Sequence, residues 1–124
     1  MKLQTVIEKL DLHAVSKLEE KNVQGVFISD MLSDVMIGAK SGDLWLTVQT
    51  HTNLISVANL VDAAAVVVTC GKKIPEKTVE LANRYHVIIL SSGVIAIRFG
   101  DQNDYDVAPM VAVAEFYRSS NLPN

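Results

Sequence analysis

The sequence predicts an α/β fold with a mostly parallel sheet of about five strands and helices on both faces. Two observations lead to this prediction. Short apolar runs with β-branched or aromatic residues, such as Val26–Ile28 and Leu44–Val48, stop abruptly at small polar residues. Each run is followed by a segment in which apolar residues recur at helical spacing. Strand–helix units in this rhythm favour a parallel sheet with helices packed on it.

The chain can be divided into elements in order. Apolar residues at positions 3, 6, 7 and 10 predict a helix over Leu3–Leu10. Strands are expected at Leu12–Val15, Gly25–Ile28, Leu44–Gln49, Ala64–Thr69, Val87–Leu90 and, as an edge strand, Val94–Phe99. Further helices are expected at Met31–Ala39, at Asn53–Leu60, from Pro75 to about Tyr85, and from Tyr105 or Asp106 to Arg118. Ser29 or Asp30 is the expected N-cap of the second helix, and Thr52 or Asn53 that of the third.

Length and composition limit the class of protein. The chain has 124 residues, 49% of them hydrophobic and 20% charged, which fits one globular domain over residues 1–124. A net charge of −3 gives no basic face for nucleic acid or an anionic membrane. No apolar run reaches the ~20 residues of a membrane span, and the N-terminus shows no signal-peptide pattern. With Cys70 as the single cysteine, an internal disulfide is excluded and a cytoplasmic location is expected.

The polar residues that follow the predicted strands form the candidate site. Right-handed crossovers bring the carboxyl ends of parallel strands to one rim of the sheet, where α/β proteins bind ligands. Most of these residues also adjoin a helix N-terminus, which favours an anionic ligand. The candidate ligand-binding residues are Ser29, Asp30, Gln49, Thr50, His51, Asn53, Thr69 and Gly71, and the predicted loop Ser91–Gly93 would lie on the same rim.

Three of these residues have more than one interpretation. Ser29 and Asp30 fit either ligand contacts or helix caps. His51 fits a ligand hydrogen bond or a structural role, and it is also the one plausible acid–base group on the rim. Catalysis would require a partner that sets its tautomer, and Asp30 would serve if the two strands were adjacent.

The segment after the fourth strand is also open to more than one interpretation. Cys70 fits a small core residue or a redox-sensitive thiol beside Lys72 and Lys73. The two lysines fit a solvated turn or a phosphate contact, and Trp45 fits the core or an interface. The chain contains no metal-ligand spacing, P-loop, nucleophile elbow or paired-carboxylate motif, so no metal and no cofactor are predicted.

Two stretches resemble a known family. Phe27–Met36 and Gly42–Asn53 resemble the DRTGG domain, and the similarity extends from about Leu3 to Ser92. The resemblance implies a fold like that of the N-terminal domain of HPr kinase/phosphorylase. DRTGG domains occur beside phosphotransacetylase domains and between the CBS domains of some inorganic pyrophosphatases, as regulatory and dimer-forming modules near bound adenine nucleotides. Stand-alone members are often encoded near iron-only hydrogenase maturation and redox genes, which implies a sensory role in signalling.

The chain departs from the family pattern in two places. The name-giving Asp-Arg-Thr-Gly-Gly string is absent, and its nearest counterpart is Asn22–Gly25. Gly93–Asn103 is an insertion before the segment with Phe116 and Tyr117 that resembles the family's last helix. Any function of the missing string, and the role of the insertion, therefore cannot be transferred from the family.

Taken together, the residues and the resemblance predict a non-catalytic regulatory or ligand-sensing domain. The expected ligand is an adenine nucleotide or another phosphorylated metabolite at the rim, and the expected assembly is a homodimer. One alternative is a module that docks onto a partner enzyme or kinase and binds no small molecule. The third hypothesis is an enzyme that acts on a phosphate ester through His51 and Asp30.

Overall fold

A computed structural model describes residues 1–92 of the chain. Its elements are α1 Leu3–Leu10, β1 Leu12–Ala14, β2 Gly25–Ile28, α2 Leu32–Gly38, β3 Asp43–Thr47, α3 Asn53–Val61, β4 Ala65–Val68, α4 Glu76–Arg84 and β5 Ile89–Ser92. This order confirms the predicted alternation of strands and helices. No helix among residues 1–92 is long and apolar enough to cross a membrane. The strand predicted at Val94–Phe99 and the helix predicted up to Arg118 lie outside the described residues.

The sheet has the strand order β1-β5-β4-β3-β2. β2, β3, β4 and β5 are parallel to one another, and β1 pairs antiparallel with β5. The predicted mostly parallel five-stranded sheet is therefore confirmed. Each parallel strand lies beside the one that precedes it in the sequence, so the order never reverses between β2 and β5.

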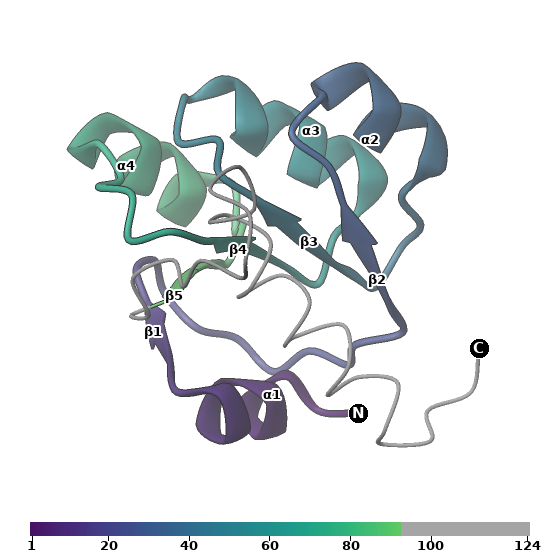
Figure 1. Cartoon of the computed structure of the whole chain (residues 1–124). Coiled ribbons are helices and arrows are strands. Elements are labelled where there is room, and N and C mark those ends of the chain that lie inside the picture. The colour runs from purple at the N-terminus through teal and green to yellow at the C-terminus, as the bar shows by residue number, and fades with distance from the viewer. Residues whose placement is uncertain (93–124) are drawn as a thin grey trace, which may run out of the picture.

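This consecutive order determines which face each helix covers. Right-handed crossovers between consecutive neighbours always pass over the same face of the sheet. α2, α3 and α4 accordingly lie together on one face, and α1 lies on the other (Figure 1). Helices cover both faces as predicted, with three of the four described helices on one side.

Successive side chains of each central strand pack alternately on the two faces of the sheet. Leu44 and Leu46 of β3 pack on the α1 face, whereas Trp45 between them packs under α2 and α3. Trp45 is fully buried, which confirms its interpretation as a core residue. β3 and β4 are buried along their whole length, as expected for parallel strands covered on both sides.

Two predicted strand ends are wrong by a few residues, for identifiable reasons. The fifth strand runs to Ser92 and not to Leu90, because Ser91 and Ser92 pair with His13 and Leu12 of β1. These serines are strand residues and do not form a rim loop. The third strand ends at Thr47 and not at Gln49, since the amide N–H of Val48 donates to a side chain in place of a strand.

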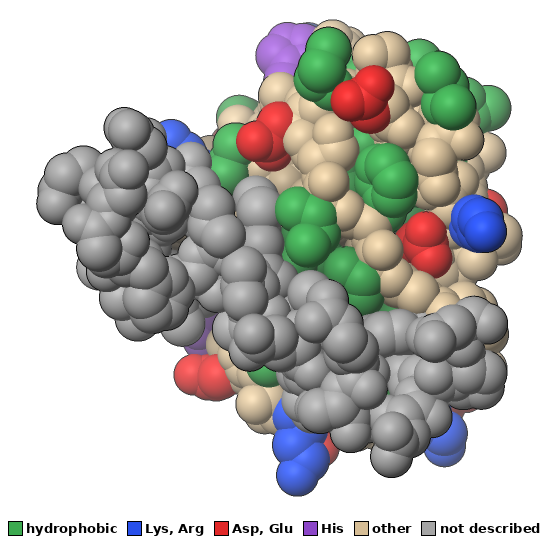
Figure 2. Space-filling view, turned by 45° about the vertical axis from the view of Figure 1, so that its right-hand side comes forward, with side chains coloured by type: hydrophobic (Ala, Val, Ile, Leu, Met, Phe, Trp, Pro, Cys, Tyr) green, Lys and Arg blue, Asp and Glu red, His purple; other side chains and the backbone are tan. Residues whose placement is uncertain are grey.

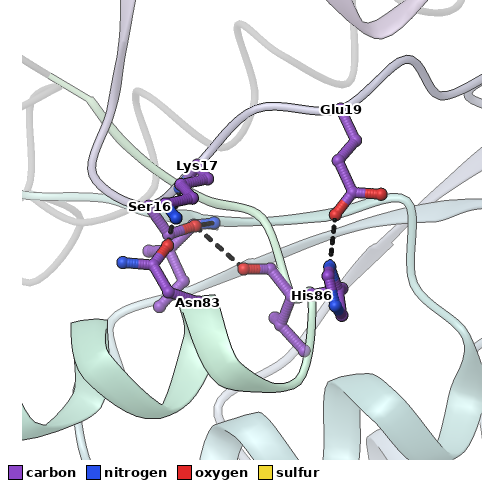
Figure 3. A network of polar contacts seen from close by, with 7 residues as sticks. Ser16, Lys17, Glu19, Asn83 and His86 are labelled. Carbon is purple, nitrogen blue, oxygen red and sulfur yellow. Dashed lines mark hydrogen bonds and ion pairs between the residues drawn. The ribbon is translucent and has the colours of Figure 1, made fainter.

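The segment that follows β1 forms hydrogen bonds with the last turn of α4 and with the residues that lead into β5 (Figure 3). The buried Ser16 hydroxyl donates to the Val87 carbonyl at 2.8 Å and accepts from the Ile89 N–H at 2.7 Å. The Lys17 N–H donates to Asn83 Oδ1 at 2.8 Å. The Glu19–His86 pair at 3.0 Å is exposed to solvent and adds little to stability.

Candidate functional site

The carboxyl ends of β2, β3, β4 and β5 lie at one edge of the sheet, which we call the rim. Because these strands are parallel and in register, the residues after β2, β3 and β4 all emerge there. The structure thus brings the eight predicted site residues to one edge: Ser29, Asp30, Gln49, Thr50, His51, Asn53, Thr69 and Gly71. Their hydrogen bonds divide them into two groups with different roles.

The first group holds the ends of β2 and β3 together. Asp30 Oδ1 accepts hydrogen bonds from the Thr47 hydroxyl and from the Val48 N–H, both at 2.8 Å. Gln49 Nε2 donates to the Asp30 carbonyl at 3.0 Å, and the Gln49 N–H donates to Thr47 Oγ1 at 3.1 Å. We call Ser29, Asp30, Thr47 and Gln49 the β2–β3 brace.

Ser29 belongs to the brace mainly through its backbone. Its N–H donates to the Leu46 carbonyl at 3.2 Å, and its carbonyl accepts from Trp45 Nε1 at 2.8 Å. Its hydroxyl accepts from the Met31 N–H at 3.1 Å, one residue before α2 begins. The N-cap of α2 is Met31, without a side-chain cap, so the predicted capping by Ser29 or Asp30 is wrong. The reason is a tertiary contact: the Asp30 carboxylate accepts hydrogen bonds from Thr47 and Val48 at the end of β3 and does not bind the first turn of α2.

The second group surrounds the amino ends of α3 and α4. His51 is exposed, and its Nδ1 accepts from the Asn53 N–H at 3.2 Å, at the start of α3. Thr52 is the N-cap residue of α3, as predicted, but its side chain makes no capping hydrogen bond. Because Nδ1 is an acceptor, the neutral imidazole carries its proton on Nε2. The ring can therefore donate a hydrogen bond from Nε2.

Asp30 and His51 form no hydrogen bond or ion pair with each other. The Asp30 carboxylate is engaged in the brace, and His51 Nδ1 faces its own helix. A dyad for phosphate-ester chemistry is therefore not assembled. Among the described residues there is also no group of three or more His, Cys, Asp or Glu that could hold a metal ion.

One hydrogen bond joins the two helix starts. The fully buried Thr78, in the first turn of α4, donates from its hydroxyl to the Thr50 carbonyl at 2.8 Å. Neither α3 nor α4 has a side-chain hydrogen bond to its first turn from its N-cap residue. The amino ends of α3 and α4, where each helix dipole is positive, therefore lie next to each other on the rim.

The turn after β4 lies on the same edge. Thr69 is buried, and its N–H donates to the Thr47 carbonyl at 3.0 Å. Cys70 and Gly71 have φ angles of 67° and 61°, in the left-handed region that favours glycine. A side chain built on Gly71 would meet no atom within 4 Å, so the turn is open on that side. Lys72 and Lys73 follow it and are exposed.

Two cavities lined by described residues lie elsewhere, and no sequence pattern indicated them. One of about 620 Å³ lies between α1 and the chain that approaches β2, and is lined by Lys2, Leu3, Gln4, Ile7, Leu18, Glu19, Glu20, Lys21 and Asn22. Another of about 200 Å³ lies near the amino ends of β2 and β3, and is lined by Lys21, Asn22, Gln24, Ser41, Gly42, Asp62, Ala63 and Ala64. Neither includes a rim residue. The consecutive strand order explains this, since rim crevices in α/β sheets form where the order reverses.

Sequence reasoning missed Thr47 and Thr78, which organise the two groups. Each leaves a weak signal in the sequence. Thr47 is the single hydroxyl residue in the apolar run Leu44–Val48, and Thr78 comes three residues after Pro75. A fully buried threonine needs a hydrogen-bond partner, and both have one on the neighbouring element.

Comparison with known proteins shows a likeness to solved structures. No protein-family profile matches the chain, and no curated protein does. The fold is similar to the CBS and DRTGG domains of the regulatory region of Clostridium perfringens pyrophosphatase, solved in complex with the activator diadenosine tetraphosphate. The TM-score is 0.60 at 12% identity, over 90% of this chain and 45% of that one. The chain thus spans less than half of that regulatory region. The likeness shows a fold of the kind found there, and membership of the DRTGG family stays a prediction.

Proposed function

We propose that this chain is a non-catalytic regulatory domain that senses an anionic ligand, an adenine nucleotide or another phosphorylated metabolite. The supporting observation is the Thr78–Thr50 hydrogen bond, because it places two helix amino ends side by side. The positive dipole ends of the two helices favour a phosphate group at this place. We call Thr50, His51, Asn53, Thr69 and Gly71, with Lys72 and Lys73, the α3–α4 rim site.

Each part of the rim site has a distinct role in this proposal. His51 donates from Nε2, and the exposed Asn53 side chain offers both a donor and an acceptor. Gly71 leaves room for close approach of a ligand to the backbone. Lys72 and Lys73 supply positive charge beside the turn. Ser29, Asp30 and Gln49 act indirectly, through the brace that fixes the end of β3.

The structural neighbour supports the choice of ligand. It is the regulatory region of a pyrophosphatase, and its activator carries adenosine and phosphate groups. Adenine nucleotides and dinucleoside polyphosphates are therefore the first ligands to test. We further propose that the domain works in the cytoplasm as a homodimer.

A docking role is the second candidate, favoured by a different observation. Ile37 on α2 is 87% exposed and Met31, just before that helix, is 61% exposed. Apolar side chains this exposed suit contact with another protein. In this candidate the rim binds no small molecule, and the domain acts through a partner enzyme or kinase.

A thermal-shift screen separates the two candidates. A ligand present at 100 times its dissociation constant adds about 2.7 kcal/mol to the folded state, which raises Tm by several degrees. The sensing proposal expects such a shift with one of the adenine nucleotides, dinucleoside polyphosphates, acyl phosphates or inorganic phosphate. The shift should disappear in His51→Ala and persist in His13→Ala, a matched control on the exposed side of β1. If no compound shifts Tm, the docking candidate is favoured, and a shift that survives His51→Ala would mean that the ligand binds elsewhere.

A further inference from the structure

β2 is an open edge of the sheet. It is the last strand in the order, and its backbone pairs on one side with β3. The Ser29 N–H donates to the Leu46 carbonyl on the β3 side, so the alternation of the strand turns the backbone groups of Val26 and Ile28 outward. No described strand pairs with this outer side. Upstream the edge is closed, because the Val23 N–H donates to the Met1 carbonyl at 2.7 Å.

This edge lacks the usual protection against pairing with another chain. Gly25–Ile28 contains no lysine and no proline, which natural edge strands use to prevent strand addition. Ile28 is 43% exposed, and the exposed Met31 and Ile37 lie next along the chain and on α2. Figure 2 looks onto the side with β2 and α2 and shows hydrophobic side chains spread across it. We call Val26, Phe27, Ile28, Met31 and Ile37 the β2 edge surface.

α2 lies close against this edge. A Cβ added at Gly38 would come within 2.7 Å of the Phe27 ring, so the helix backbone rests on β2 at that point. Asp34 precedes Gly38 by one helical turn and therefore lies on the same side of α2. Asp34 is exposed, and it sits in the first turn of α2, near the carboxyl end of β2. Lys40 is also exposed, and it comes before β3, near the amino end of β2.

We infer that the β2 edge surface is the homodimer interface, in which β2 pairs antiparallel with β2 of a second copy around a twofold axis. The inference rests on the homodimer in the proposed function. A twofold axis reverses the direction of the second β2, so Asp34 of each copy faces Lys40 of the other. The outward groups of Val26 and Ile28 would exchange about four backbone hydrogen bonds and join the two sheets into one.

Charge exchange tests this arrangement in the full chain. The molar mass of the wild type, measured by light scattering, should be twice the 13.5 kDa of one chain. Asp34→Lys and Lys40→Glu each turn two symmetric attractions into repulsions. The dimer dissociation constant should therefore rise about tenfold or more in each single variant. The double variant Asp34→Lys/Lys40→Glu restores opposite charges and should recover the wild-type dissociation constant.

Matched controls separate the surface from a general charge effect. Lys77→Glu and Glu80→Lys make the same changes on exposed positions of α4, over the far part of the sheet, and should leave the dissociation constant unchanged. Ile28→Lys places a charge on the open edge and should weaken the dimer about tenfold, with an unchanged circular dichroism spectrum.

Each other outcome overturns the inference. A wild type that is monomeric overturns both the interface and the proposed homodimer, while the nucleotide-sensing proposal is still decided by the thermal-shift screen. A dimer that is insensitive to Asp34→Lys, Lys40→Glu and Ile28→Lys uses another surface. Single variants that weaken the dimer without recovery in the double variant would rule out the antiparallel pairing.

Discussion

Asp30 Oδ1 accepts a 2.8 Å hydrogen bond from the hydroxyl of Thr47, a fully buried residue 17 positions later in the chain. The same oxygen accepts the Val48 N–H, so one carboxylate fixes the point where β3 leaves the sheet. The rim loop with Thr50 and His51 begins two residues later. The geometry of the rim site therefore depends on a side chain that need not touch the ligand.

Replacing Asp30 with alanine should destabilise the protein. The change leaves the buried Thr47 hydroxyl without its acceptor, which costs about 1–3 kcal/mol. Urea unfolding measures the loss. Glu80→Ala, an exposed carboxylate on α4, is the control and should change stability by less than about 0.5 kcal/mol. Equal stability of the two variants would show that the brace does not hold β3.

Ser16→Ala should loosen the attachment of the N-terminal part. The Ser16 hydroxyl is buried and both donates to Val87 and accepts from Ile89, so its loss leaves two backbone groups unsatisfied. The expected cost is about 1–3 kcal/mol. His86→Gln removes the exposed ion pair with Glu19 and should leave Tm almost unchanged. A larger effect from His86→Gln than from Ser16→Ala would contradict the assignment.

Thr78→Val tests the link between the two helix starts. Valine has nearly the shape of threonine but cannot donate to the Thr50 carbonyl. We expect a loss of about 1 kcal/mol and faster hydrogen exchange in the first turn of α4. If the rim site is correct, any nucleotide-induced shift in Tm also decreases. Thr5→Val on α1 is the matched control, since it lies on the other face of the sheet and should change neither quantity.

Gly25→Ala should be destabilising because of crowding. An added Cβ would fall 2.5 Å from Asp43 Oδ1, and the other oxygen of that buried carboxylate is held by the Lys40 N–H at 2.9 Å. The expected cost is about 1–3 kcal/mol. A double-mutant cycle with Asp43→Ala checks the cause, because removing the carboxylate removes the clash. Additive losses in the double variant would mean that the two residues do not meet.

Sequence patterns were sufficient to predict the type and order of the helices and strands in residues 1–92. The helix at Leu3–Leu10 and the strand at Gly25–Ile28 have the predicted bounds, because apolar period and turn residues are local properties. The continuous apolar run Ala64–Val68 correctly indicated a strand buried on both faces. The parallel direction of β2 to β5 followed from the alternation of strands and helices.

For the candidate site, the sequence predicted which residues lie at the rim but not the hydrogen bonds between them. Capping rules consider neighbours in sequence, and they assigned Asp30 to α2 although its carboxylate binds Thr47 and Val48 on another strand. The hydrogen bond between Thr78 and Thr50 likewise joins segments 28 residues apart. Strand order is also non-local: among the described strands it does not reverse from β2 to β5, so the rim lacks the reversal at which α/β sheets form a ligand crevice.

The antiparallel position of β1 has a consequence for the order of assembly. During synthesis each of β3, β4 and β5 emerges beside a neighbour that has already been made. β1 must wait for β5, and the Ser16–Ile89 contact spans 73 residues. A contact that closes so long a loop forms late and slowly, because the chain loses conformational entropy before the stabilising contacts are made. β1, which is made before the other four strands of the sheet, is thus the last of them to be paired.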